Sequence, residues 1–435
     1  MKPRVNLITM GCSKNLVDSE RVLKMLADAG VEAVHDADNF EGGTVVINTC
    51  GFIGDAKEES INAILEACEC KKSGTIDRVY VMGCLSERYR EELKQEIPEV
   101  DGWYGKFDWK SVAETVSRSP RHHTSLEWDR RITTPSHHAY LKIAEGCNRM
   151  CAFCAIPIIT GRYHSRPADE IIDEVKSLVA RGVKEFNIIA QDLSNYGRDL
   201  GGRQEPSPLA SLLERMASIP GVEWIRLHYA YPADFPYDIL PVMAAHDNIC
   251  NYLDIALQHI DDTVLANMHR HINAEQTERL LERLRNEVPG IHIRTTLMVG
   301  FPGETDEAFD RLVEFVKKQR FDRMGAFAYC EEDDTRAARE FNDDIPADVK
   351  QSRLDKLMAV QEEIALELNE AKIGCTMKVV VDSENDDYYV CRSQFDSPEV
   401  DPEVLVEKSQ PMKIGNFYNV KITQAMPFEL IAVPC

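Results

Sequence analysis

The sequence predicts an α/β protein in three parts: an amino-terminal doubly wound parallel sheet, a central partial (β/α)6 barrel and a carboxyl-terminal small β-barrel. Three observations lead to this prediction. Up to about residue 345, short apolar strands alternate with amphipathic helical segments, which is typical of parallel sheets. One long helical pattern follows, and after it short strands stand without helices between them. The 435 residues are also too many for a single compact core.

The first predicted domain spans residues 1–117 and alternates strands with helices. Its strands read VNLITM, TVVINTC and RVYVMGC, and a helical pattern follows each of them, at 16–29, at 56–68 and from residue 86 onwards. Strands that are separated by helices run parallel, because each helix carries the chain back across the sheet. We therefore expect a doubly wound sheet whose functional residues lie at the carboxyl ends of its strands.

One cysteine stands beside a glycine at the end of each of these strands. The three are Cys12 in TMGC, Cys50 in TCG and Cys84 in MGC. Glycine lets a backbone or a bulky group approach closely. A free cysteine is often only a small buried residue, and this is the alternative for each of them alone. Three cysteines at the same structural position favour a shared site.

A polar linker over residues 118–137 is rich in Arg, His, Ser and Thr and separates the first domain from the second. The second domain, residues 138–345, has six strand-like segments with helical patterns between them. These segments read YLKIAEG, EFNIIAQD, WIRLHYA, YLDIALQH, HIRTTLMVGFP and MGAFAYC. Six βα units are too few to close an eight-fold barrel, so we expect a partial barrel with its chemistry at the strand ends.

The carboxyl-terminal part begins with one long helix over residues 346–371, in which Leu354, Leu357 and Val360 recur at helical spacing. After it, residues 372–435 switch to short strands such as MKVVVDSE, YYVCRSQ and NFYNVKITQ. Short strands without helices between them are typical of a small β-barrel.

Composition limits the classes of protein to which the chain can belong. No apolar segment approaches the roughly 18–20 residues that span a bilayer, and the start, MKPRVNLITMGC, reads as a strand and not as a signal peptide. We expect a cytoplasmic protein without a membrane partner, whose 13 cysteines are reduced thiols used as ligands or nucleophiles. The net charge of −23 disfavours nucleic acid and favours a basic protein as the substrate.

The densest group of cysteines lies in EGCNRMCAFCAIP, where Cys147, Cys151 and Cys154 directly follow the first barrel strand. A structural zinc site normally takes four protein ligands. Three thiolates on a four-iron, four-sulfur cluster instead leave one iron without a protein ligand, and a substrate or cofactor can coordinate there. Phe153 offers an apolar face beside that place.

The spacing Cys-x3-Cys-x2-Cys resembles the signature of the radical S-adenosylmethionine enzymes, and the expected partial barrel is the fold of that superfamily. In these enzymes the open iron is chelated by S-adenosyl-L-methionine, which an electron from the cluster cleaves to a 5′-deoxyadenosyl radical. With Cys12, Cys50 and Cys84 on its first domain and a small β-barrel at its end, the chain resembles the methylthiotransferases over essentially its whole length.

This resemblance implies two [4Fe-4S] clusters, one on each group of three cysteines. The cluster on the central cysteines generates the radical, and the cluster on the amino-terminal cysteines delivers the sulfur. The resemblance also implies an electron donor and makes the terminal barrel a TRAM domain. It assigns no catalytic residue beyond the cluster ligands.

The methylthiotransferases have two branches. The MiaB-type modifies an adenosine in transfer RNA, and the RimO-type modifies the β-carbon of an aspartate in the twelfth protein of the small ribosomal subunit. An RNA-binding TRAM domain should be basic. From Lys372 onwards, however, six Lys and Arg stand against ten Asp and Glu, a balance of 6 − 10 = −4, which suits a basic ribosomal protein better than RNA.

The segments IIAQDLSNYGRD and LDIALQHI resemble the RimO-type as well. We therefore predict a RimO-type enzyme that acts on a small-subunit ribosomal protein and does not bind RNA directly. Methylthiolation of transfer RNA is the alternative within enzymes. A non-catalytic protein that stores or senses through iron–sulfur clusters is the alternative from another class.

Two acidic runs in the terminal barrel predict its recognition surface for a basic protein. Solvated charge without a binding role is the alternative. The runs are Asp382–Glu384–Asp386–Asp387 and Asp396–Glu399–Asp401–Glu403.

Further contacts to the cofactor are expected from residues at the barrel mouth. Gln191 ends the second barrel strand, and the loop GFPGET contains Gly303 and Glu304. The glycines of this loop allow a cofactor to approach the backbone closely, and a tight turn around Pro302 is the alternative.

At four positions the residue differs from the one that is usual in the family. Ala256 stands where proline is usual, His269 and His271 stand where an arginine-rich run is common, and Cys330 stands where serine is usual. These changes affect the barrel mouth and leave its detailed contacts open, but none of them removes a cluster ligand.

Overall fold

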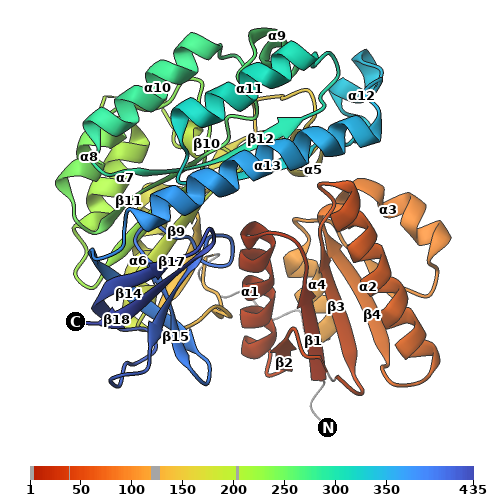
Figure 1. Ribbon diagram of the computed structural model, residues 1–435. Helices are drawn as coiled ribbons and strands as arrows, with labels where there is room; N and C mark the ends of the chain where they lie inside the picture. Colours follow the sequence, from red (N-terminus) through yellow and green to blue (C-terminus); the bar gives the residue numbers. More distant parts are fainter. Residues whose placement is uncertain (1–3, 39, 119–127, 202–204) are drawn as a thin grey trace.

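The computed structural model describes residues 4–38, 40–118, 128–201 and 205–435. The chain has three parts: an amino-terminal sheet domain drawn red to orange, a central curved sheet with its helices, and a carboxyl-terminal barrel drawn blue (Figure 1). This arrangement confirms the predicted fold class. Part of the predicted linker, residues 119–127, lies outside the described residues.

Five parallel strands form the amino-terminal sheet, in the order β2-β1-β3-β4-β5. Helices α1 and α4 cover one face, where Leu23 packs in one cluster with Leu7, and helices α2 and α3 cover the other, where Ile64 packs in one cluster with Ile47. Helices on both faces make the sheet doubly wound. The elements are β1 Arg4–Thr9, α1 Ser13–Asp28, β2 Glu32–His35, β3 Thr44–Thr49, α2 Gly54–Lys72, β4 Arg78–Gly83, α3 Cys84–Glu96, β5 Gly102–Trp103 and α4 Trp109–Ser117.

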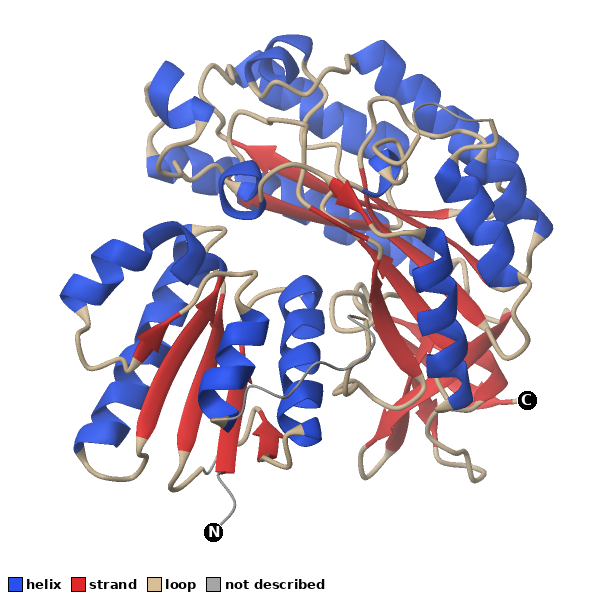
Figure 2. Ribbon diagram, turned by 180° about the vertical axis from the view of Figure 1, so that it is seen from behind, coloured by secondary structure: helices blue, strands red, loops and turns tan. Residues whose placement is uncertain are grey.

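Six parallel strands form the central sheet, in the order β13-β12-β11-β10-β9-β6. Among the described strands, β6 pairs in this sheet only with β9 and β13 only with β12, so the sheet curves without closing into a barrel. Figure 2 shows the helices of this domain gathered on the outer side of the sheet. The strands are β6 His138–Lys142, β9 Glu185–Ile189, β10 Trp224–Ala230, β11 Ile249–Ile255, β12 His292–Val299 and β13 Arg323–Ala328.

The other elements of this domain connect these strands. They are β7 Ala144–Glu145, α5 Ile156–Thr160, β8 His164–Ser165, α6 Ala168–Ala180, the 3₁₀-helix η1 Leu193–Asn195, α7 Pro208–Ala217, α8 Ile239–Ala245, α9 Asp262–Asn267, α10 Ala274–Glu287, α11 Asp306–Gln319 and α12 Arg336–Glu340.

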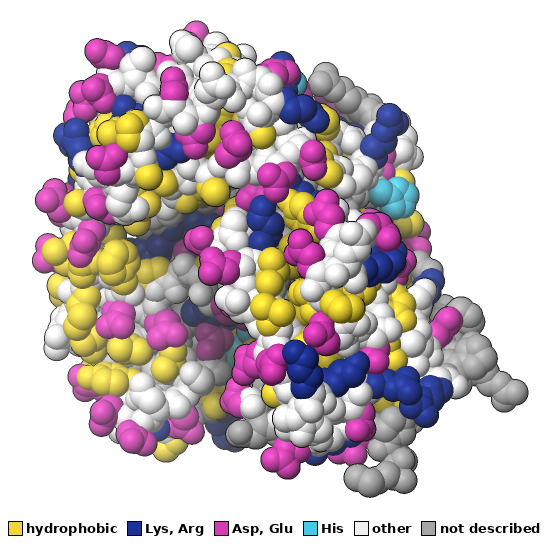
Figure 3. All heavy atoms as spheres, turned by 90° about the vertical axis from the view of Figure 1, so that its right-hand side faces the viewer, with side chains coloured by type: hydrophobic (Ala, Val, Ile, Leu, Met, Phe, Trp, Pro, Cys, Tyr) yellow, Lys and Arg dark blue, Asp and Glu magenta, His cyan; other side chains and the backbone are white. Residues whose placement is uncertain are grey.

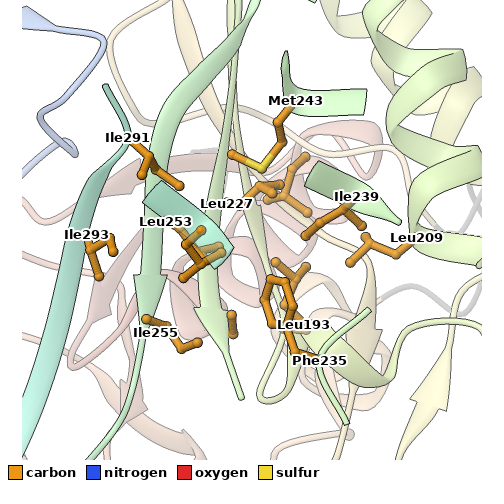
Figure 4. Packing of buried hydrophobic residues seen from close by; sticks show 14 of the residues in the cluster. Leu193, Leu209, Leu227, Phe235, Ile239, Met243, Leu253, Ile255, Ile291 and Ile293 are labelled. Carbon is orange, nitrogen blue, oxygen red and sulfur yellow. The ribbon is translucent and has the colours of Figure 1, made fainter. Parts of the chain in front are cut away.

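The largest apolar core lies between the central sheet and its outer helices (Figure 4). Leu227 and Leu253 of the sheet pack in one cluster with Ile239 and Met243 of α8, and all four are buried. Burial of each such side chain stabilises the fold by about 1.5–3 kcal/mol. This packing makes the strands a firm base for the loops at their carboxyl ends.

The carboxyl-terminal part is one long helix followed by a closed five-stranded barrel, in which β14, β15, β16, β18 and β17 pair in that order. The barrel strands that the sequence indicated became β14, β15 and β17, whereas the short β16 and β18 were not singled out. No helix in the described part of the chain is long and apolar enough to cross a bilayer. The elements are α13 Ala347–Glu370, β14 Thr376–Glu384, β15 Tyr388–Ser393, β16 Glu403–Glu407, β17 Phe417–Ala425 and β18 Glu429–Pro434.

A buried ion cluster joins this barrel to the central sheet. Glu185 of β9 accepts hydrogen bonds from Arg392 of β15 at 2.8 Å and from Arg226 of β10 at 3.2 Å. Arg392 also donates to Asp382 at 2.6 Å. Burial opposes ionisation of Glu185, but the positive charges of Arg392 and Arg226 outweigh it and hold the pKa of that carboxyl below its usual range.

The same contact corrects the prediction of one acidic recognition surface. Asp382 pairs with Arg392, Asp396 pairs with Arg323 at 2.7 Å, and Asp401 pairs with Arg294 at 3.3 Å. Asp396 and Asp401 each expose 2% of their side chains. Asp396 and Asp401 therefore bind the central domain, and Asp382 is engaged by Arg392 within the barrel, so none of the three is available to a partner. Because both acidic runs contribute to this buried contact, neither is the continuous surface that the sequence suggested.

We expect Glu185→Gln to destabilise the protein by about 3 kcal/mol, because it leaves the buried Arg226 without its carboxylate and removes one of the two carboxylates that pair with Arg392. The measurement is urea unfolding followed by circular dichroism. Glu223→Gln is the matched control, because its pair with Lys378 at 3.1 Å is exposed and contributes about 0.5 kcal/mol. Equal losses in the two variants would contradict a structural role for the buried cluster.

Candidate active site

The three amino-terminal cysteines meet at one edge of the first sheet. They follow β1, β3 and β4, which are neighbours in the sheet, and Thr49 and Gly83 stand opposite each other in the register of β3 and β4. Cys50 and Cys84 therefore leave the sheet at the same level. Gly11, with φ of +88°, packs so closely that a Cβ placed on it would lie 2.8 Å from the Cys50 Sγ.

Charge distinguishes Cys12 from its two neighbours. Burial opposes ionisation of Cys12, but the positive charges of Lys14 and Lys106 and nearby backbone N–H groups outweigh it and lower the pKa of this thiol. Burial raises the pKa of Cys50, and it raises the pKa of Cys84 to about 12. The surroundings thus favour the thiolate form at Cys12 and disfavour it at Cys50 and Cys84.

The central cysteines lie on the loop that follows β7. The backbone N–H of Cys147 donates to the Gly161 carbonyl at 3.2 Å, and Arg270 and Tyr231 approach the Cys151 Sγ to 3.4 and 3.7 Å. Burial raises the pKa of Cys147 to about 12 and also raises that of Cys154. These contacts hold the loop in place at the mouth of the partial barrel.

Each group offers three thiols, which is the number of protein ligands on a four-iron cluster that keeps one iron open. Within the described residues, no three His, Cys, Asp or Glu side chains are placed to hold one ion. The thiolates of a four-iron cluster surround a larger group, because each binds a different iron. Since burial raises the pKa of most of these thiols, iron would be the cation that keeps them ionised.

Buried polar atoms without partners mark the space beside the central cysteines. The Oε1 atoms of Gln191, which follows β9, and of Gln258, which follows β11, have no hydrogen-bond partner among the described residues. Gln191 uses its Nε2 to donate to Glu145. Because an unpaired buried acceptor costs free energy, these two atoms fit a polar ligand such as the ribose or amino group of S-adenosyl-L-methionine.

The other predicted contacts lie around the same mouth. The Phe153 ring packs edge-on against Phe301, with centroids 6.4 Å apart. Gly303 is exposed and has φ of +86°. Glu304 is buried, and its carboxylate accepts from the Gly300 N–H at 2.9 Å and from Arg353 at 2.9 Å. One oxygen of Glu304 thus closes the turn and the other pairs with Arg353 of α13, whereas Phe153 and Gly303 stand at the mouth.

The four residues that differ from those usual in the family also lie near this mouth. The Ala256 carbonyl accepts a hydrogen bond from Arg270. His269 and His271 both have positive φ, their rings lie 4.3 Å apart, and His269 faces the Met150 carbonyl at 3.1 Å. Cys330 is exposed beside Glu332, which pairs with Lys57 and Arg88 of the first domain.

A buried network of charges separates the two thiol groups. Asp18 of α1 accepts from Lys106 at 3.1 Å and from Lys142 at 2.5 Å, and Lys142 also donates to Glu145 at 2.7 Å. Glu145 stands two residues before the first central cysteine. Sequence reasoning missed this network, as it missed the roles of Gln258, Arg270 and Tyr231, because their partners lie far away along the chain.

Comparison with known proteins finds three matching families in chain order. Residues 4–105 match the Uncharacterized protein family UPF0004, residues 141–316 match the Radical SAM superfamily, and residues 373–434 match the TRAM domain. Among solved structures, the chain is similar to TsrM from Kitasatospora setae, a radical S-adenosylmethionine methyltransferase with cobalamin and a [4Fe-4S] cluster bound. The TM-score is 0.56 and the sequence identity is 16%, and the match covers 75% of each chain. That likeness shows the fold.

Curated relatives match over nearly the whole chain. The ribosomal protein uS12 methylthiotransferase RimO of Phocaeicola vulgatus is 59% identical over 429 residues, with 98% of each chain covered. That of Parabacteroides distasonis is 56% identical, with 99% of this chain and 98% of the relative covered. That of Cytophaga hutchinsonii is 46% identical, with 99% and 97% covered. The chain therefore belongs to the family of the ribosomal protein uS12 methylthiotransferases RimO.

Proposed function

We propose that the protein methylthiolates the β-carbon of an aspartate in uS12, the twelfth protein of the small ribosomal subunit. The observation that carries the proposal is the placement of two groups of three thiols at the strand ends of two parallel sheets, with one buried charge network between them. The relatives at 59% and 56% identity are named as methylthiotransferases of the ribosomal protein uS12.

When bound, two [4Fe-4S] clusters and S-adenosyl-L-methionine supply the radical, the sulfur and the methyl group. Gln191 and Gln258 would orient the cofactor through their unpaired oxygens, and Phe153 and Gly303 would border it. Arg270 would hold the cysteine loop through its contact to Cys151. The cluster ligands would be Cys147, Cys151 and Cys154 in the central domain and Cys12, Cys50 and Cys84 in the amino-terminal domain.

The proposal includes the partners and the division of the chain. A basic ribosomal protein is the substrate, an external electron donor reduces the clusters, and the protein acts in the cytoplasm without binding RNA directly. The functional parts are residues 1–117, 138–345 and 372–435, joined by the linker 118–137 and the helix at 346–371. The balance of −4 over the last part supports a protein substrate over transfer RNA, because phosphate contacts require basic residues.

Mass spectrometry of a uS12 peptide tests the activity. Anaerobically reconstituted protein, S-adenosyl-L-methionine, a sulfide source and a reductant should add one methylthio group to the aspartate of the peptide. Transfer RNA that contains the adenosine target of the other branch is the competing substrate. Methylthiolation of that RNA together with an unmodified peptide would overturn the proposal in favour of the RNA-modifying branch.

Replacing Cys147, Cys151 and Cys154 by alanine should lower the iron content from about eight to about four atoms per chain, because each four-iron cluster needs its own group of thiols. The formation of 5′-deoxyadenosine, measured by chromatography, should then be lost. Cys435→Ala, at an exposed cysteine outside both groups, is the control and should keep both. Cleavage of S-adenosyl-L-methionine by the triple variant would show that these thiols are not the radical site.

The triple alanine variant of Cys12, Cys50 and Cys84 should behave differently. It should keep about four iron atoms and still form 5′-deoxyadenosine, because the central thiols are intact. Its yield of methylthiolated peptide should fall below detection by mass spectrometry. A full yield of product would mean that the amino-terminal thiols are only packing residues.

A further inference from the structure

Strand β10 carries a β-bulge near its carboxyl end, around Tyr229. Leu227 pairs with Leu253 of β11 and Ala230 pairs with Ile255, so three residues of β10 advance against two of β11. Tyr229 lies within the bulge and has a φ of +61°. In the described part of the chain it is the one non-glycine residue inside a strand whose φ is positive. Such a backbone is strained for a bulky side chain.

An ion pair holds this strained backbone in place. The Tyr229 N–H donates to the Asp254 carboxylate at 3.1 Å, and Asp254, which is buried, pairs with Arg294 at 3.1 Å. Backbone strain persists only where the surrounding structure enforces it, and it gathers at functional sites. Bulges at the rims of barrels redirect a side chain. The direction of the Tyr229 ring is therefore what the bulge determines.

The bulge turns Tyr229 out of the packed interior. Its neighbours His228 and Ala230 expose 5% and 3% of their surfaces, whereas Tyr229 exposes 36%. Lys14 of the first domain covers one face of the ring, with its Nζ 3.0 Å from the ring centroid. The exposed part of Tyr229 is open to a ligand.

Tyr229 lies between the two groups of thiols. Lys14, which covers its ring, stands two residues after Cys12. Tyr231, two residues after Tyr229, has its hydroxyl 3.7 Å from the Cys151 Sγ. A substrate carbon that both groups of thiols serve must lie in the space between them. The exposed part of Tyr229 borders that space.

We infer that Tyr229 is a positioning residue whose ring holds the substrate segment that carries the target aspartate; this inference rests on the proposed function. An aromatic ring offers a large contact area and loses little conformational freedom when it binds. Because the bulge and its ion pair fix the backbone, the ring is already in place before the substrate arrives. Contact with it keeps the β-carbon of the aspartate within reach of both groups of thiols.

The test compares the unchanged, reconstituted full chain with substituted ones. Tyr229→Phe keeps the ring. Tyr229→Asn removes it and suits the backbone, because Asn adopts a positive φ more readily than most side chains. Tyr237→Asn is the matched control. Tyr237 is half-buried against the outer core, and Arg283 lies over its ring, 3.7 Å from the centroid.

Fluorescence anisotropy with a uS12 peptide should show about tenfold weaker binding for Tyr229→Asn, the effect of losing a central aromatic contact. Tyr229→Phe and Tyr237→Asn should bind as the unchanged protein does. The ratio of 5′-deoxyadenosine to methylthiolated peptide should rise about tenfold in Tyr229→Asn alone, because a poorly placed peptide lets the cofactor be cleaved without product.

Two further measurements separate positioning from a structural role. Tyr229→Asn should keep about eight iron atoms per chain. Its urea midpoint should not fall, because relief of the strained backbone offsets the lost contact with Lys14. Tyr237→Asn should show the opposite pattern, a lower midpoint with unchanged peptide binding, because it loses packing against the core.

An unchanged affinity and an unchanged ratio in Tyr229→Asn would overturn the inference and leave the ring as an attachment for the first domain. Tyr229→Gly, which adopts a positive φ without strain, is a second variant and should show the same losses as Tyr229→Asn. Equal losses in Tyr229→Phe would assign the contact to the hydroxyl and also overturn the role of the ring. A peptide that the unchanged protein neither binds nor modifies would contradict the proposed function itself.

Discussion

The spacing between the two groups of thiols depends on one buried carboxylate, that of Asp18. It takes hydrogen bonds from Lys142 of β6 and from Lys106 of the first domain, and Lys142 also holds Glu145. Burial opposes ionisation of Asp18, but these lysines outweigh it and hold its pKa below the usual range. Helix α1, which follows the first cysteine, is thereby tied to the strand that leads to the central cysteines.

Two further attachments fix the orientation of the first domain. On the side of α1, Glu20 pairs with the fully buried Arg130, which also pairs with Glu174 at 2.8 Å. On the side of α2 and α3, Glu332 pairs with Lys57 at 2.8 Å and with Arg88 at 3.0 Å. These ion pairs hold helices on opposite faces of the sheet. A rotation of the domain would therefore break the pairs and leave buried charges without partners.

Local pattern explains which parts of this site the sequence could predict. The six cysteines were predictable because strand ends and short spacings are properties of neighbouring residues. The charge network was not, since Lys106 and Asp18 are 88 residues apart and Lys142 and Asp18 are 124 apart. The acidic runs misled for the same reason: nothing local shows that Asp396 faces Arg323 across a domain contact 73 residues away.

The charge of the molecule changes sign between its surface and its site. The chain carries −23 overall, and Figure 3 shows acidic side chains spread over one face while some basic ones lie inside a hollow. Buried or half-buried cations gather between the thiol groups, and carboxylates such as Asp18 and Glu145 neutralise only part of them. They are Lys14, Lys106, Lys142, Arg149 and Arg270.

The two signs act over different distances. The negative surface field reaches about one Debye length, roughly 8–10 Å at physiological salt, and favours encounter with a basic protein. In the protein interior the dielectric constant is lower than in water, so a buried cation such as Lys106 acts strongly on the groups beside it. An acidic enzyme can therefore attract a basic ribosomal protein as a whole and still keep positive charge beside its thiols.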